Sequence, residues 1–312
     1  MATATKNRKA YSQVKDTYTE ITNQILALLE EGTVIWQQPW KTIADGMPTS
    51  LSTGKLYRGI NIFILEFEAM VKGYSSNLWG TYRQIQERGG QVRKGEKSTS
   101  IVFWKLLSKD VEVDGETKTK RIPLLRTYNV FNVNQCDWAD DAKLPPVAER
   151  VQVDVIEAAE ALIADYLAKG PSLGHGGSRA YYRQADDHIQ MPERDDFING
   201  EEYYSTLYHE ATHSTGHSKR LHRQGIAEGT FGKFGDPVYS YEELVAEMGA
   251  AMLSGIAGID QTTITASAAY LAHWAKALKE DNKIIVQAAA QAQKAVDLIV
   301  GNTFADNDGE EG

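Results

Sequence analysis

The sequence predicts an α+β protein of two domains, in which an N-terminal domain of helices and antiparallel strands precedes a C-terminal, mostly helical domain. Residues 1–135 hold 19 of the 33 Lys and Arg but 13 of the 42 Asp and Glu, which gives them a net charge of +6. Because the net charge of the whole chain is −9, residues 136–312 carry a net charge of −15. The boundary falls near 137–146, a loop-like stretch whose final two prolines cannot continue a helix or central strand. We therefore expect a basic domain over 1–136, a linker over 137–150, a second domain over 151–304 and a disordered acidic tail over 305–312.

Hydrophobic periodicity predicts the elements of the N-terminal domain. Apolar residues recur at three- and four-residue steps from Val14 to Leu29, and Gly32 follows where that helix would end. The expected elements are helices over residues 12–31, 61–72 and 81–88, then strands over 99–106 and 124–133 that a charged hairpin over 110–120 connects. These strands are expected to form an antiparallel ribbon that packs on the helices.

The C-terminal domain is predicted to be dominated by helices. A glycine-rich segment over residues 170–177 lacks the Walker pattern, so we expect a loop there with no role in phosphate binding. The expected elements are helices over residues 153–168, 203–213 and 239–253, a short hairpin of 179–183 with 188–191, and an Ala-rich helical region over 264–300 that breaks near Asp281 and Asn282. An exposed strand of such a hairpin can pair with an extended peptide.

The run His209-Glu-Ala-Thr-His213 contains the parts of a zinc site and of a general base. Positions four apart share one face of an α-helix, so His209 and His213 can bind one metal ion, and Glu210 is placed to deprotonate a water on it. Zinc lowers the pKa of such a water to about 7. The surrounding segment contains no Gly or Pro and is apolar on one side, as the half-buried helix of a zincin metallopeptidase must be. We expect one zinc ion per chain, with Glu210 as the catalytic base.

The third metal ligand has three candidates. His217 follows His213 by four residues, but an intervening glycine predicts that the helix ends before it. Glu243 and Glu247 are four apart on the second amphipathic helix, which resembles the gluzincin arrangement of one Glu ligand and an acidic residue one turn later that steadies a ligating His. The metzincin pattern is excluded because Lys219 stands where its third His would be. We assign Glu243 as the ligand and Glu247 as its supporting residue, with the alternatives open.

The basic domain has the composition of a surface that binds single-stranded DNA. Its first 135 residues hold 14 of the 29 Phe, Trp and Tyr residues, interleaved with basic side chains. Cations along the phosphates and exposed rings against the bases bind single strands without much sequence preference. Zinc fingers, basic zippers and other motifs that read a sequence are absent. The candidate contact residues are Lys55, Tyr57, Arg58, Trp79, Tyr82, Arg83, Arg93, Lys94, Lys97, Trp104 and Lys105.

Composition also bounds the compartment. The sequence has no apolar run of the roughly 18 residues that a membrane span needs, and its polar N-terminus has no apolar segment behind it, so neither a span nor a secretion signal is expected. The single cysteine, Cys136, cannot form an intrachain disulfide and suits a reducing cytoplasm as a free structural thiol. We expect a cytoplasmic protein without a membrane partner.

Six stretches together resemble one family, the ArdC-like antirestriction proteins of conjugative plasmids and phages. They are Tyr57-Arg-Gly-Ile-Asn61, Val92-Arg-Lys-Gly-Glu-Lys97, Tyr128-Asn-Val-Phe-Asn132, His188-Ile-Gln-Met-Pro192, His209-Glu-Ala-Thr-His-Ser-Thr-Gly-His217 and Glu242-Glu-Leu-Val-Ala-Glu-Met-Gly249. The resemblance covers nearly the whole chain. It implies an N-terminal single-stranded-DNA-binding domain, a C-terminal zincin-like metallopeptidase domain and protection of incoming plasmid DNA from host restriction. It also implies metal on His209 and His213, with Glu210 as base.

Two functions of different classes follow from these observations. In the first, the protein coats DNA, and its metal site is structural or active only under certain conditions. In the second, it is an active zinc endopeptidase that the basic domain brings to DNA. The intact Glu210 favours retained chemistry, because a purely structural metal site has no need of a base.

Overall fold

The structure is a computed structural model that describes most of the chain. The described residues are 18–19, 21–23, 25–26, 46–113, 116–142, 144, 155–229, 237–259 and 278–302, with only the backbone described at 70, 104–113, 116–125, 155 and 237–240. Within these ranges, no helix combines the length and the apolar character that a membrane crossing requires. The acidic segment over 305–312 and most of the expected first helix lie outside the described residues, although those described between 18 and 26 are helical.

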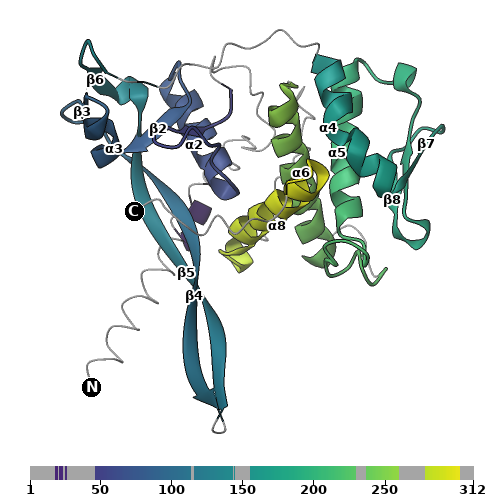
Figure 1. Ribbon diagram of the computed structural model, residues 1–312. Coiled ribbons are helices and arrows are strands. Elements are labelled where there is room, and N and C mark those ends of the chain that lie inside the picture. Colours follow the sequence, from purple (N-terminus) through teal and green to yellow (C-terminus); the bar gives the residue numbers. More distant parts are fainter. Residues whose placement is uncertain are drawn as a thin grey trace.

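A four-stranded sheet forms the centre of the N-terminal part, in the order β1-β2-β5-β4. β1 (Thr49–Ser50) is parallel to β2 (Leu78–Thr81), whereas β5 (Glu116–Asn132) is antiparallel to both β2 and β4 (Thr99–Val113). The β4–β5 pairing runs from Thr99 opposite Val130 to Val113 opposite Glu116, and this ribbon projects from the rest of the protein (Figure 1). The predicted antiparallel ribbon is confirmed, with longer strands than expected.

Both predicted short helices of the N-terminal part are confirmed as α2 (Ile60–Lys72) and α3 (Tyr82–Glu87). The start of α3 is fixed by a capping box, in which the Thr81 hydroxyl and the Gln84 side chain each accept a hydrogen bond from the other residue's backbone N–H. The sequence did not predict the short strands β3 (Gly90–Val92) and β6 (Cys136–Trp138), which form a separate antiparallel pair. A single 3₁₀ turn, η3 (Val133–Gln135), precedes β6, which extends into the expected linker.

Most of the described residues of the C-terminal part lie in four long helices (Figure 1): α4 (Val155–Lys169), α5 (Gly200–Thr215), α6 (Pro237–Ala257) and α8 (Ile284–Ile299). The expected break in the last helical region is confirmed, since residues 278–280 are helical and α8 begins only after Asp281 and Asn282. Short 3₁₀ turns precede α5 in this part of the chain: η4 (Gln184–Asp186) connects the strands over 181–183 and 188–191, and η5 (Arg194–Asp196) lies between the second of these strands and α5.

A three-stranded sheet precedes α5, in the order β7-β9-β8. β8 (Tyr181–Arg183) and β9 (His188–Met191) form the predicted antiparallel hairpin. The expectation of a loop over residues 170–177 is wrong in part, because β7 (Ser172–His175) pairs in parallel with β9. Pairing with a formed neighbour outweighs the low strand propensity of glycine here. Since β9 is central, β7 and β8 are the edges of this sheet.

The N-terminal and C-terminal parts share one hydrophobic core. The largest cluster of buried apolar side chains combines Phe63 of α2 with Leu244 of α6 and Val286 of α8. Two smaller clusters belong to the N-terminal part alone. The expected domain limits stay a prediction, but the two parts do not have fully separate cores.

Candidate metal centre

The helix α5 presents both histidines of the motif on one face. Its N-cap, Asn199, accepts a hydrogen bond from the backbone N–H of Glu202 at 2.8 Å, which satisfies one of the donors that the first helical turn leaves unpaired. After its first residue the helix contains neither Gly nor Pro until it ends at Thr215. His209 and His213 therefore lie one turn apart, with their rings edge to face at a centroid distance of 4.7 Å.

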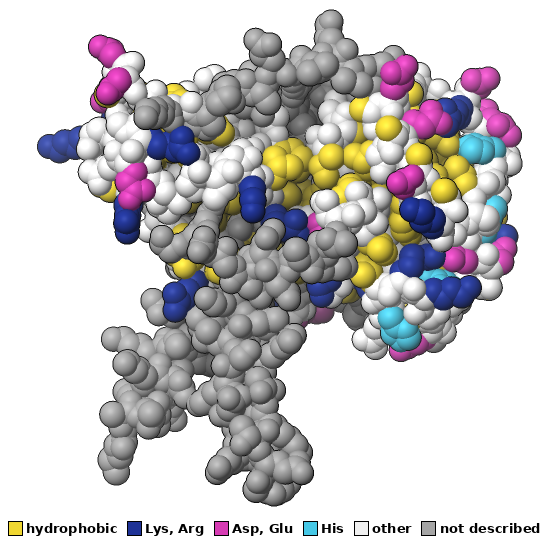
Figure 2. Space-filling view, in the orientation of Figure 1, with side chains coloured by type: hydrophobic (Ala, Val, Ile, Leu, Met, Phe, Trp, Pro, Cys, Tyr) yellow, Lys and Arg dark blue, Asp and Glu magenta, His cyan; other side chains and the backbone are white. Residues whose placement is uncertain are grey.

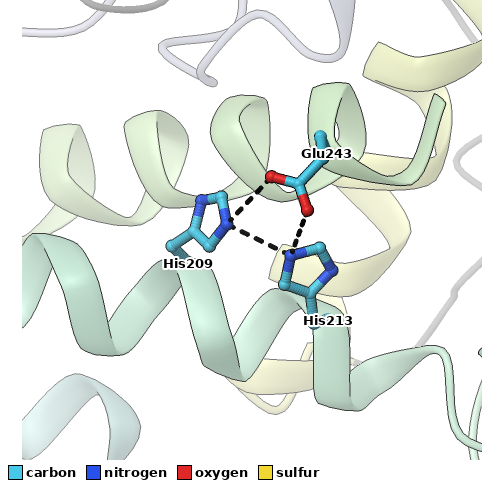
Figure 3. Close-up of side chains that lie close together, drawn as sticks. All are labelled: His209, His213 and Glu243. Atoms are coloured by element: carbon cyan, nitrogen blue, oxygen red, sulfur yellow. Dashed lines mark hydrogen bonds and ion pairs between the residues drawn. The ribbon is translucent and has the colours of Figure 1, made fainter. Parts of the chain in front are cut away.

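The carboxylate of Glu243, on α6, faces both histidines (Figure 3). Its Oε2 lies 3.6 Å from Nε2 of His209, its Oε1 lies 3.6 Å from Nε2 of His213, and the two Nε2 atoms are 3.1 Å apart. One ligand atom from each residue can be chosen so that all lie within 4.8 Å of one another. The structure thus brings together the three residues that the sequence predicted as ligands, while metal binding by them stays a prediction.

The close approach of α6 to α5 depends on Gly249. A Cβ atom built on Gly249 would lie 2.5 Å from Cγ2 of Thr212, which is fully buried in α5. The Thr212 side chain is also held in place, because its hydroxyl donates a hydrogen bond to the Tyr208 carbonyl at 2.8 Å. A glycine at this position lets α6 lie close enough for Glu243 to reach the histidines.

The site has a strongly negative electrostatic environment. Burial of the His209 imidazole disfavours its cation, but the nearby carboxylates of Glu243, Glu247 and Glu210 outweigh this effect and raise the pKa of His209 to about 10. Glu210 is itself buried, at 8% exposure. The cluster therefore attracts positive charge.

A carboxylate that the sequence analysis did not identify, Glu242, contacts the other ring nitrogen of His213. Its Oε1 lies 3.3 Å from Nδ1 of His213, and the guanidinium of Arg223 donates to both of its oxygens, at 2.9 Å from Nε and 2.5 Å from Nη2. Burial alone would raise the pKa of Glu242, but the hydrogen bonds and charge of Arg223, together with His213, hold that pKa below its usual value. The signals for it were its place beside Glu243 and its position at the start of the last of the six family stretches, whereas Arg223 lies in none of them.

The two alternative ligands lie outside the converging group. Glu247 Oε1 is 4.0 Å from Nδ1 of His209, beyond hydrogen-bond distance, so it acts on that ring through charge. His217 follows the end of α5, and its Nδ1 accepts a hydrogen bond from the backbone N–H of Lys219 at 3.1 Å. Glu242 makes a contact of this supporting kind on the other histidine, while the supporting role of Glu247 stays a prediction.

Among the predicted DNA contacts, the aromatic residues have different environments. Trp79 is fully buried in the N-terminal core, and its Nε1 donates to Oδ1 of Asn77 at 3.3 Å. Its ring faces cannot reach a base in this conformation, so the prediction of stacking on Trp79 is wrong. Tyr57 is half-buried, and its hydroxyl donates to the Trp79 carbonyl at 3.3 Å. Tyr82, at 44% exposure, presents a ring to solvent. The side chain of Trp104 lies outside the described residues.

Three of the predicted cationic contacts have acidic partners within the protein. Arg58 pairs with Asp297, Arg83 pairs with Glu87, and Arg93 pairs with Glu96 and also donates to the backbone carbonyls of Asn134 and Cys136. The remaining described cations, Lys55, Lys94 and Lys97, are exposed. The side chain of Lys105 lies outside the described residues. On the face in Figure 2, the described Lys and Arg side chains of the N-terminal part are scattered rather than gathered in one patch.

The buried thiol of Cys136 fits the expected structural role. Burial raises the pKa of Cys136 to about 11, although the nearby Arg93 acts in the opposite direction. The thiol is therefore neutral near pH 7 and unreactive.

Family models match both parts of the chain. The N-terminal domain of anti-restriction factor ArdC matches residues 15–131, and a zincin-like metallopeptidase, MPTase-PolyVal, matches residues 157–291. The second match contains His209, Glu210, His213 and Glu243. The two parts that the sequence distinguishes thus correspond to two families.

Similar proteins extend over nearly the whole chain. The protein y4eC of Sinorhizobium fredii (strain NBRC 101917 / NGR234) is 36% identical over 292 residues, which are 90% of this chain and 91% of that protein. Two Escherichia coli proteins named DNA primase TraC are 34% and 33% identical over 92% and 90% of this chain, which spans only 27% and 19% of their lengths.

The solved structures of the antirestriction ArdC protein from plasmid R388 are similar in fold as well as sequence. At 38% identity, the metal-free structure has a TM-score of 0.71 and the Mn(II)-bound structure one of 0.70. Each likeness covers 92% of this chain, and 97% and 98% of those chains. The chain therefore belongs to the ArdC family of antirestriction proteins and has a zincin-like metallopeptidase domain in its C-terminal part.

Proposed function

We propose that this protein binds single-stranded DNA through its N-terminal part, carries a zinc-dependent metallopeptidase site on α5 and α6, and protects incoming plasmid DNA from host restriction. The observation that carries the metal-dependent part is the convergence of His209, His213 and Glu243. Membership of the ArdC family supports the role in antirestriction.

The donor set fits a divalent cation. Two imidazole nitrogens and one carboxylate oxygen are the protein ligands of one class of catalytic zinc site, which leaves a further position for water or substrate. The negative charge around His209 stabilises any cation there, and a divalent metal ion gains more from it than a singly charged proton does. The Mn(II)-bound structure of the R388 protein supports a divalent metal in this family. When bound, zinc would supply the Lewis acidity that activates a water molecule and polarises a peptide carbonyl.

The residues of the chain would carry out the proton transfers and hold the substrate. Glu210 accepts the proton of the attacking water and then donates it to the leaving amine nitrogen as the peptide bond breaks. The edge strand β8, which packs against α5, offers backbone groups to an extended peptide. β9 is unsuited to that role because both of its sides are already paired.

The exposed lysines of the N-terminal part support strand binding. Lys94 and Lys97 flank Gly95 in the connection between β3 and β4, where the positive φ of 96° of that glycine makes a tight turn. Tyr82 lies on α3 nearby in the sequence, with an exposed ring that a base can stack on. Ion pairing with phosphates would release counterions, so affinity should fall steeply as salt rises.

A second candidate function is proteolysis of a host protein as the main activity, with DNA binding serving to recruit the enzyme. The retained Glu210 favours it, because metal binding alone does not require that carboxylate. The first candidate needs no bond cleavage, since restriction enzymes generally act on duplex DNA and a covered single strand is not yet a target.

The Glu210→Gln variant of the full chain distinguishes the two candidates. We expect it to retain metal and strand binding, because Glu210 is outside the ligand group. If coating protects the DNA, restriction of an incoming plasmid in cells stays suppressed, and if proteolysis is the mechanism, protection is lost while strand binding in vitro is normal. His209→Ala is the control that loses metal.

The strand-binding proposal is tested with Lys94→Ala/Lys97→Ala. We expect weaker binding of single-stranded oligonucleotides of arbitrary sequence, a shallower salt dependence and loss of protection in cells. Arg93 is left intact, because its side chain holds the backbone of residues 134 and 136 and its removal would disturb the fold. Equal affinity of the wild-type protein for duplex and single strand would contradict the proposal.

A further inference from the structure

His213 is contacted at both of its ring nitrogens, by groups of different kinds. Nε2 faces His209 and Glu243, whereas Nδ1 lies 3.3 Å from the Glu242 carboxylate. A neutral imidazole that binds a cation through Nε2 carries its proton on Nδ1, and that proton needs an acceptor. Glu242 is in the place of that acceptor, and at 1% exposure it is shielded from water.

Arg223 determines what Glu242 can do. Its guanidinium donates to both carboxylate oxygens of Glu242 in a bidentate pair, and it is itself 6% exposed. Such a pair fixes the plane of the carboxylate and balances its charge in a region where an unpaired charge would be costly. Glu242 is thereby oriented toward Nδ1 of His213, while the neighbouring Glu243 is left to face the ligand side.

The same guanidinium connects Glu242 to the end of the metal-site helix. Arg223 Nη2 donates to the Thr212 carbonyl at 2.7 Å, and Nη1 donates to the Thr215 hydroxyl at 2.6 Å. These contacts add to the hydrogen bond that the Thr215 hydroxyl donates to the Thr212 carbonyl at 2.6 Å, and they bring positive charge to the C-terminus of α5. One side chain therefore couples the helix that carries His213 to the helix that carries Glu243.

We infer that Glu242 and Arg223 are a positioning pair for the metal site, an inference that rests on the proposed function. Glu242 holds the proton of His213 on Nδ1 and so keeps Nε2 available as a ligand. Arg223 keeps Glu242 in that orientation and out of the ligand group. Neither residue touches the substrate, so their effect is on cation affinity and on the state of His213.

The test uses the full chain, Zn²⁺ alone and a competing chromophoric chelator. In Glu242→Leu/Arg223→Met both charges are replaced by apolar side chains, which a fold tolerates better than one unpaired buried charge. We expect zinc affinity to fall by about 10–100-fold, as for other residues that support a ligating histidine. The melting temperature of the metal-free protein should stay near that of the wild type.

A matched control comes from the other arginine of the same connection. Arg220 donates to the Ser214 carbonyl and pairs with Asp187, so its side chain holds the end of α5 without contacting His209 or His213. Asp187→Leu/Arg220→Met should therefore leave zinc affinity unchanged. If both double variants lose affinity equally, or if Glu242→Leu/Arg223→Met binds as tightly as the wild type, the inference is overturned. Failure of the wild-type protein to bind zinc would instead reject the proposed function.

A second readout serves if the double variant does not fold. In zinc-loaded protein labelled with ¹⁵N-histidine, we expect a slowly exchanging Nδ1–H signal from His213, protected by Glu242. Glu242→Gln, which keeps the size of the side chain, should speed that exchange and weaken zinc binding. Exchange at the wild-type rate in this variant would show that Glu242 does not hold the proton.

Discussion

Asp297 of α8, at 4% exposure, accepts a hydrogen bond from the guanidinium of Arg58, which lies two residues before α2. The contact is reinforced by Gln293, whose Oε1 accepts from the Gly59 backbone N–H at 3.0 Å and whose Nε2 donates to Asp297 Oδ1 at 3.2 Å. The two residues join the N-terminal part to the last helix. Arg58 therefore has a structural partner in place of the phosphate that the sequence predicted for it.

Removing the Arg58 side chain should destabilise the protein more than it weakens strand binding. Arg58→Ala leaves a buried carboxylate without its cation, and we expect a loss of about 1–3 kcal/mol in the free energy of unfolding, less than for a fully buried pair because Arg58 is half-exposed. Urea unfolding measures the loss. Arg58→Ala/Asp297→Asn should recover part of it. A large fall in strand affinity without loss of stability would show that Arg58 contacts DNA after all.

The packing of α6 on α5 gives a prediction for Gly249→Ala. The added methyl group would lie 2.5 Å from the Thr212 side chain, so the helices must separate and Glu243 must withdraw from the histidines. We expect destabilisation of about 1–3 kcal/mol, as for other overpacked cores, together with weaker zinc binding. Thermal unfolding and chelator competition measure the two effects. Gly249→Ala/Thr212→Ala removes both side-chain atoms nearest to the added methyl group, Cγ2 and Oγ1 of Thr212, and should restore zinc affinity.

The ligand assignment predicts a graded series of metal affinities. His209→Ala, His213→Ala and Glu243→Ala should each abolish stoichiometric zinc binding, because each removes one of three converging ligand atoms. Glu247→Ala should cost no more than about 10–100-fold, since it acts through charge from beyond hydrogen-bond distance. Isothermal titration with Zn²⁺ gives the comparison. Loss of metal from Glu247→Ala but not from Glu243→Ala would reverse the assignment.

The raised pKa of the Glu66 carboxyl leads us to expect that the stability of the protein depends on pH. Burial, opposed in part by the hydrogen bond from Asn77, raises the pKa of Glu66 to about 7, from about 4.5 in the unfolded chain. The folded protein therefore keeps a proton that the unfolded chain releases, and this stabilisation is present below pH 4.5 and lost as pH rises to 7. The change is on the order of 3 kcal/mol. Glu66→Gln should remove this decline in urea-unfolding measurements, whereas Glu68→Gln on the same helix should leave it.

The sequence predicted the parts of the site that depend on local geometry. His209 and His213 share a face because of helical periodicity alone. The assignment of Glu243 as a ligand followed from a second amphipathic segment and from its four-residue spacing to Glu247. The partnership of Glu242 with Arg223 was not predictable, because it depends on the path of the chain after α5 and not on a repeat. The prediction that Trp79 stacks on a base was wrong for a related reason. An aromatic residue beside a cation looks the same in a sequence whether its strand is exposed or, as in β2, central in a sheet that packs on helices.

The shared core also constrains how this protein can evolve. Because Phe63 packs among side chains of α6 and α8, an exchange of genes with a crossover between the two halves would pair surfaces that were not selected together. Substitutions along α2 and along the last helix are therefore expected to co-vary among descendants. Selection on the N-terminal part and selection on the zincin-like part then act on one inherited unit, and a change that benefits one half is tested at once by its effect on the other.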